Sequence, residues 1–193
     1  MPPGASGLSP GPGVLLPHLA GPAAAIRQVV AGHALTGLDH IVEIGGAGLP
    51  VTGFLRHRPQ SVTVIDPKIE PWEADKLDGR PCRVRHLCRK FVDADADAVQ
   101  PGTGVVLLGL SLKPLGTRPA VTAALVSLCA RASRVVLEYS LSLDRALSQV
   151  PELVDRAGLV ELWGVDLGLR DGLLVQAGHD QRRLLVLEAR RSP

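Results

Sequence analysis

A glycine-rich run that follows a short apolar segment is the part of the chain best suited to chemistry. Residues 41–50 read IVEIGGAGLP, with three glycines in four positions. Glycine between a strand and a helix lets the backbone turn sharply and approach a ligand, and the start of the helix offers free N–H groups. We therefore predict that Gly45, Gly46 and Gly48 form a turn that binds a ligand.

Neighbouring residues narrow the class of that ligand. Leu49 and Pro50 stand where a nucleoside-triphosphate loop has Lys followed by Ser or Thr. A hydrolase elbow would need a serine between flanking glycines, and none is present. A dinucleotide fingerprint would need a third glycine where this chain has Val51. The run therefore disfavours triphosphate, nicotinamide and flavin sites.

Two acidic residues accompany the turn. Glu43 lies two residues before Gly45, and Asp66 ends the next apolar run, 23 positions after Glu43. The Glu43 carboxylate would either receive hydrogen bonds from a cationic amino-acid ligand or organise its own turn. Asp66 would either form a turn with Pro67 or bind both hydroxyls of a ribose, since one carboxylate offers two acceptors. Together the two acids favour a ligand that contains adenosine.

The elements that must position these residues alternate between strand and helix. Apolar runs rich in β-branched residues predict strands over 40–45, 61–66, 83–87, 104–110 and 134–140. Helices are predicted within 14–34, from Pro50 to just before Pro59, and over 119–130 and 143–157. Two further strands, 159–167 and 182–190, should pair antiparallel. This order predicts a mostly parallel sheet with helices on both faces and an antiparallel pair at its C-terminal end.

Length and composition restrict the function classes. A chain of 193 residues predicts one domain, over 14–193, after a Pro- and Gly-rich disordered tail over 1–13. Aromatic residues make up 3% and the net charge of +2 is spread along the chain, which disfavours a nucleic-acid partner. The three cysteines fit neither a disulfide framework nor a zinc site, and no segment predicts a signal peptide or membrane helix. We expect a cytoplasmic protein with no membrane partner and no metal.

The glycine run resembles the first motif of class I S-adenosylmethionine-dependent methyltransferases, an acid followed by a glycine-rich turn. Glu43 and Gly45 match the acid and the first glycine, while Gly46 and Gly48 are shifted by one position. The run GGAGLPVT also resembles the variant turn of nicotianamine-synthase-like enzymes, which share the superfold. The wider resemblance spans residues 38–190. It implies a three-layer Rossmann-like α/β sandwich with a seven-stranded, mostly parallel sheet, and S-adenosyl-L-methionine as cofactor.

The same resemblance implies which residues form the site. The methionine part of the cofactor would lie against Glu43 and the turn, and Asp66 would bind the ribose. The rest of the cofactor-binding set comes from the turn, the adenine contact and the segment after the fourth strand: Gly45, Gly46, Ala47, Gly48, Pro67, Cys88 and Leu110. The catalytic candidates on the acceptor side are Ser111, Lys113 and Tyr139.

The activity that the resemblance implies is methyl transfer to a small-molecule or tethered acceptor. Such a reaction needs alignment with an electrophilic carbon more than a dedicated base. Three alternatives stay open. They are transfer or cyclisation of the aminocarboxypropyl arm with release of methylthioadenosine, a non-catalytic binding protein, and a nicotinamide-dependent oxidoreductase. A homodimer is left open as well.

Overall fold

The computed structural model describes residues 21–46, 49–91, 99–100, 102–108, 112, 115–140, 144–168 and 181–190. Its helices are α1 (Gly21–Ala34), α2 (Pro119–Arg131), α3 (Asp144–Arg156) and a short 3-10 helix, η2 (Val51–Phe54). Its strands are β1 (His40–Ile44), β2 (Ser61–Ile65), β3 (Trp72–Leu77), β4 (Arg80–Leu87), β5 (Thr103–Leu107), β6 (Arg134–Ser140), β7 (Leu159–Gly168) and β8 (Gln181–Ala189). These eight strands form one sheet in the order β3-β4-β2-β1-β5-β6-β8-β7.

The centre of the sheet is parallel and its C-terminal end is antiparallel. Strands β4, β2, β1, β5 and β6 run in one direction, whereas β8 runs against both β6 and β7. All five residues of β5 are buried, because a parallel strand in the middle of the sheet is covered on both faces. The predicted Rossmann-like α/β class, with its antiparallel C-terminal pair, is confirmed.

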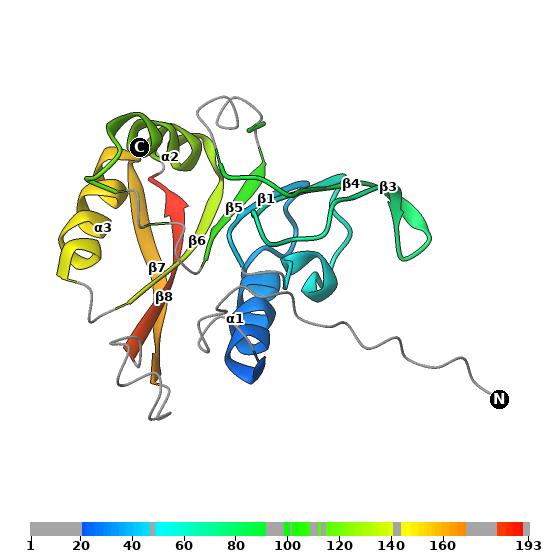
Figure 1. Ribbon diagram of the computed structural model, residues 1–193, viewed down its shortest axis with the longest axis horizontal. Helices are drawn as coiled ribbons and strands as arrows, with labels where there is room; N and C mark the ends of the chain where they lie inside the picture. The colour runs from blue at the N-terminus through cyan, green and yellow to red at the C-terminus, as the bar shows by residue number, and fades with distance from the viewer. Residues whose placement is uncertain are drawn as a thin grey trace.

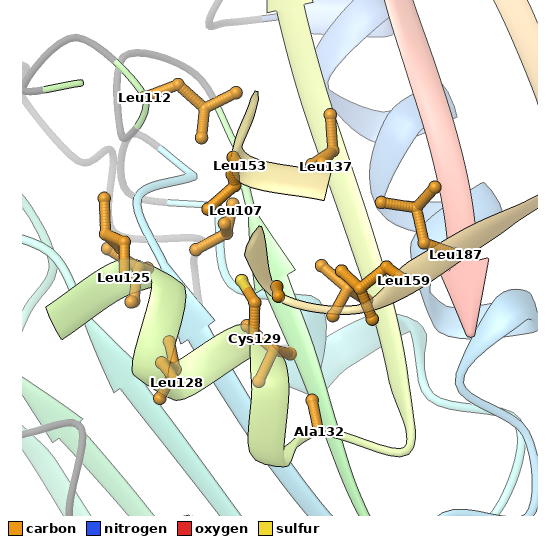
Figure 2. Close-up of a cluster of buried hydrophobic side chains, with 14 of the residues drawn as sticks. Leu107, Leu112, Leu125, Leu128, Cys129, Ala132, Leu137, Leu153, Leu159 and Leu187 are labelled. Atoms are coloured by element: carbon orange, nitrogen blue, oxygen red, sulfur yellow. The ribbon is translucent and has the colours of Figure 1, made fainter. Parts of the chain in front are cut away.

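Helices cover the two faces of the sheet unequally (Figure 1). On one face, α2 and α3 pack over β5, β6, β7 and β8 and enclose an apolar cluster of leucines and smaller residues. Figure 2 shows Leu125, Leu128 and Cys129 of α2 directed into this cluster together with Leu107, Leu137 and Leu153. On the opposite face, α1 and η2 cover a second cluster built on β1, β2, β4 and β5.

Two glycines allow α1 to lie close to its neighbours. A Cβ atom at Gly104 on β5 would lie 2.4 Å from Leu35 Cδ2, and one at Gly32 would lie 2.3 Å from the Phe54 carbonyl oxygen. The C-terminal half of α1 is therefore seated directly on η2, and Leu35, just after the helix, packs on β5. This helix accounts for the later part of the predicted helix within 14–34; residues 14–20, and the predicted tail over 1–13, lie outside the described residues.

Strand β3 was not predicted, and it raises the number of strands from the expected seven to eight. It pairs antiparallel with β4 at the edge of the sheet. Its residues are exposed or half-buried, so they lack the apolar run on which the prediction of strands depended. The sequence did carry a local signal for this hairpin, the pair Asp78-Gly79. The two residues have φ angles of 49° and 76°. An Asp-Gly pair with positive φ at both positions is typical of a tight hairpin turn.

The helix predicted from Pro50 to just before Pro59 was also wrong in extent. Only Val51–Phe54 form a helical turn, and the backbone is extended again at Leu55, with φ −68° and ψ 128°. Thr52 and Gly53 are poor helix formers, and four residues are too few to support an α-helix. Seated under α1, η2 serves as a short connection between β1 and β2. No helix in the described part of the chain is long and apolar enough to cross a membrane.

Candidate functional site

The sheet changes its direction of winding between β1 and β5. Strands β2, β4 and β3 lie on one side of β1, whereas β5, β6, β8 and β7 lie on the other. Gly45 N donates to the Ile65 carbonyl of β2 at 3.0 Å, while Leu108 N, just after β5, donates to the Ile44 carbonyl at 3.1 Å. The chain passes from β1 to β2 through η2 on one face, and from β5 to β6 through α2 on the other. Open α/β sheets bind ligands outside the carboxyl ends of their strands at such a point. The predicted glycine turn lies there.

Two positions of the turn require glycine. Gly45 and Gly46 have φ angles of 89° and 109°, which residues with a side chain rarely adopt. A Cβ atom at Gly46 would also lie 2.6 Å from Glu43 Oε1. The Gly46 carbonyl accepts Leu49 N at 3.3 Å and Arg27 Nη2 of α1 at 3.2 Å. The predicted residues Ala47 and Gly48 lie outside the described residues.

Glu43 lies fully buried beneath this turn. Its Oε1 accepts Gln28 Nε2 at 2.8 Å and its Oε2 accepts Val51 N at 2.7 Å. Burial raises the pKa of Glu43 to about 7, although the hydrogen bonds from Val51 and Gln28 oppose that rise. The carboxylate therefore ties β1 to α1 and to the start of η2. This geometry fits the alternative in which Glu43 organises its own turn.

A buried group of charges, absent from the sequence-based predictions, stands beside the turn. Glu138 on β6 accepts Arg27 Nη1 at 3.3 Å and Arg182 Nε at 2.6 Å. All three side chains are 1–2% exposed. Burial lowers the pKa of Arg27, and the negative charge of Glu138 opposes this effect. The signal in the sequence was a charge in the interior of a largely apolar segment, Arg27 within GPAAAIRQVVAGHA and Glu138 within RVVLEYS.

The structure brings together three predicted residues at the ends of β2 and β4. Asp66 is 4% exposed, and its Oδ1 accepts Lys68 N at 2.7 Å. Pro67 and Cys88 are exposed next to it, with Cys88 Sγ donating to the Pro67 carbonyl at 3.6 Å. Asp66 also lies near enough to Glu43 for its charge to raise the pKa of that carboxyl. The glycine turn and the end of β2 thus belong to one region of the carboxyl edge.

Tyr139 lies on the other face of the sheet from Glu138. It is half-buried and packs against the apolar cluster under α2 and α3. Burial raises the pKa of Tyr139, and the charge of Arg183 on β8 opposes the rise. The other acceptor-side candidates, Ser111 and Lys113, and the cofactor candidate Leu110 lie outside the described residues.

The chain has the fold of known methyltransferases. It is similar to the N-methyltransferase NodS from Bradyrhizobium japonicum WM9 in complex with S-adenosyl-L-homocysteine, with a TM-score of 0.58, 12% identity and coverage of 88% of each chain. It is also similar to an rRNA methylase from Streptococcus thermophilus (TM-score 0.53, 12% identity, 86% of this chain and 95% of the other). A third match is the N-terminal domain of EvdMO1 with S-adenosyl-L-homocysteine bound (TM-score 0.50, 13% identity, 90% and 84%).

At the level of sequence, no family model and no curated protein matches the chain. The predicted resemblance to the class I S-adenosylmethionine-dependent methyltransferases is confirmed at the level of the fold.

Proposed function

We propose that this chain, which has the class I methyltransferase fold, binds S-adenosyl-L-methionine and transfers its methyl group to a small or tethered acceptor. The observation that carries the proposal is the position of the Gly45–Gly46 turn, beside Asp66 at the carboxyl edge where the sheet changes its direction of winding. NodS, which shares this fold, is an N-methyltransferase with S-adenosyl-L-homocysteine bound. We further propose that residues 14–193 act as one cofactor-binding domain.

The residue types at this edge fit the cofactor. Asp66 is an almost fully buried carboxylate at the end of the second strand, where it can accept hydrogen bonds from ribose hydroxyls. Pro67 and Cys88 are exposed beside it and offer little-charged surface for an adenine ring. Gly45 and Gly46 bring backbone without side chains to the end of β1; the Gly45 N–H is used by the Ile65 carbonyl, and the Gly46 N–H can bind the carboxylate of an amino acid.

The turn and the acceptor side would have separate tasks. When bound, the cofactor supplies a methyl carbon that is already electrophilic, so the protein must hold the acceptor in line and exclude water. We assign the glycine turn, with Ala47 and Gly48, to the methionine part, and Leu110 to the wall of the same pocket. We assign Ser111, Lys113 and Tyr139 to the acceptor. Tyr139 is a neutral phenol at pH 7, as an ordinary tyrosine is, and it would orient an acceptor by hydrogen bonding.

Charge favours a small or tethered acceptor over a nucleic acid. The net charge is only +2 and the basic residues are spread along the chain, whereas a phosphate backbone is bound by a concentrated basic surface. The rRNA methylase that shares the fold acts, by its name, on the other acceptor class. Titration with RNA at two salt concentrations separates the two classes, because salt-sensitive binding would contradict the small-acceptor proposal.

Product analysis tests the transfer itself. The protein is incubated with S-adenosyl-L-methionine and an acceptor library, and the nucleoside product is identified by mass spectrometry. We expect S-adenosyl-L-homocysteine. Methylthioadenosine would instead support transfer or cyclisation of the aminocarboxypropyl arm, which the run GGAGLP favours by its resemblance. Cofactor binding without either product would support the non-catalytic alternative.

A further inference from the structure

Two consecutive residues of α1 bind the glycine turn at both of its ends. Arg27 Nη2 donates to the Gly46 carbonyl at 3.2 Å, and Gln28 Nε2 donates to the Leu49 carbonyl. These carbonyls bracket the turn, one just after β1 and the other just before η2. The helix therefore constrains the backbone that the proposed function assigns to the methionine part of the cofactor.

The guanidinium of Arg27 is itself held in place from the sheet. Its Nη1 donates to Glu138 Oε2, while Arg182 Nε holds the other oxygen of that carboxylate at 2.6 Å. Arg27 is 1% exposed, so this long side chain has little freedom. It uses two nitrogens of its planar group at once, one for the turn and one for Glu138. A lysine has a single nitrogen on a flexible stem and cannot reproduce this fork.

The end of α1 is held against the sheet by contacts that do not involve the glycine turn. At the other end of the helix, Arg134 Nη1 donates to the Ala34 carbonyl at 2.7 Å, and Arg134 also pairs with Glu188. Leu35 packs against Gly104 in the same region. Arg134 is therefore a matched control for Arg27, since both arginines join α1 to β6 but only Arg27 contacts the turn.

We propose that Arg27 is a positioning residue of the cofactor site, which acts through the Gly46 carbonyl. Its donation fixes the orientation of the Gly46 carbonyl, and with it the backbone that follows the left-handed Gly45 and Gly46 positions at the end of β1. This inference rests on the proposed function for the identity of the ligand, but the restraint on the turn does not.

The test compares Arg27→Met and Arg27→Lys with Arg134→Met by two measurements. Hydrogen exchange reports the protection of the Leu49 and Val51 amides, which donate to Gly46 O and to Glu43. Calorimetry reports the affinity for S-adenosyl-L-homocysteine. We expect both Arg27 variants to exchange these amides faster and to bind about tenfold more weakly, the effect of one lost charged hydrogen bond. We expect Arg134→Met to melt at a lower temperature with unchanged turn exchange and affinity.

Each result decides the proposal. Unchanged exchange and affinity in the Arg27 variants would overturn the proposal. An equal loss of affinity in Arg134→Met would also overturn it, because Arg27 would then act only by holding α1 against the sheet. Glu138 keeps Arg182 when Arg27 is replaced, so no buried carboxylate is left unpaired; if Arg27→Met still fails to fold, Arg27→Lys decides by the same measurements. Absence of binding by the wild type would contradict the proposed function, whereas the exchange measurement would still decide whether Arg27 holds the turn.

Discussion

The Glu43 carboxylate closes the glycine turn by accepting the backbone N–H of Val51, with Oε2 2.7 Å from the nitrogen. Its other oxygen accepts Gln28 of α1. One buried acid thus joins β1, η2 and α1 directly beneath the backbone that we assign to the cofactor. The proposed site therefore depends on the protonation and the packing of this group.

The stability of the protein should depend on pH through Glu43. Its pKa is about 7 in the folded protein against an ordinary value of 4.5. Because the folded pKa is the higher one, the stabilisation is fully present below pH 4.5 and is lost as pH rises through 7. Its magnitude is roughly 3 kcal/mol. Urea unfolding of the wild type and Glu43→Gln from pH 4.5 to pH 8 should show this loss in the wild type alone; parallel curves would refute the assignment.

Gly46→Ala should disrupt the turn more than an equivalent change elsewhere. The new Cβ would meet both a φ of +109° and Glu43 Oε1 at 2.6 Å. We expect a loss of roughly 2–3 kcal/mol in unfolding free energy together with weaker cofactor binding. Gly37→Ala is the control, because its φ is +87° but no atom lies within 4 Å of the new Cβ. Equal losses in the two variants would show that close packing against Glu43 contributes nothing.

Asp66→Ala should weaken cofactor binding while unfolding remains cooperative. Asp66→Asn separates two roles, since its amide oxygen can still accept Lys68 N as Asp66 Oδ1 does, but the charge and the second acceptor for a ribose are lost. We expect both variants to lose about tenfold or more in affinity for S-adenosyl-L-homocysteine. Only Asp66→Ala also loses the hydrogen bond from Lys68 N to the side chain of residue 66. Unchanged affinity in Asp66→Asn would remove Asp66 from the ribose site.

Glu138→Gln should be among the most destabilising single changes in the chain. It would leave the buried guanidinium groups of Arg27 and Arg182 facing a neutral amide. Breaking a buried ion pair in this way costs about 3–5 kcal/mol. The control is Glu188→Gln, whose pair with Arg134 is about one-quarter exposed, and for which a loss of about 1 kcal/mol or less is expected. Chemical denaturation of both variants at pH 7 gives the comparison.

The strands that build the core were predictable because their residues are apolar on both faces. The parallel centre of the sheet followed from the alternation of strand and helix segments, and the antiparallel β7–β8 pair followed from the lack of a helix-length segment between those two runs. Strand β3 escaped prediction because edge residues facing solvent carry no apolar pattern, although Asp78 and Gly79 marked its turn. The four-residue η2 was overestimated because two prolines bounded a segment whose interior does not favour a helix.

The candidate site was predictable only where its residues follow directly on predicted strands. Gly45, Gly46 and Asp66 stand at the ends of recognisable strands, so their location at one edge followed from the fold class. Arg27 and Glu138 are 111 residues apart, and Glu138 and Arg182 are 44 apart. No local pattern pairs such charges, and only the folded sheet brings α1, β6 and β8 together beside the turn.

Isothermal titration calorimetry of the wild-type chain with S-adenosyl-L-homocysteine tests the central claim most directly. The proposal predicts saturable binding at one site per chain, which is lost or strongly weakened in Asp66→Asn. No binding heat at any temperature tested, together with no shift in melting temperature on addition of the ligand, would contradict a cofactor site at this edge of the sheet.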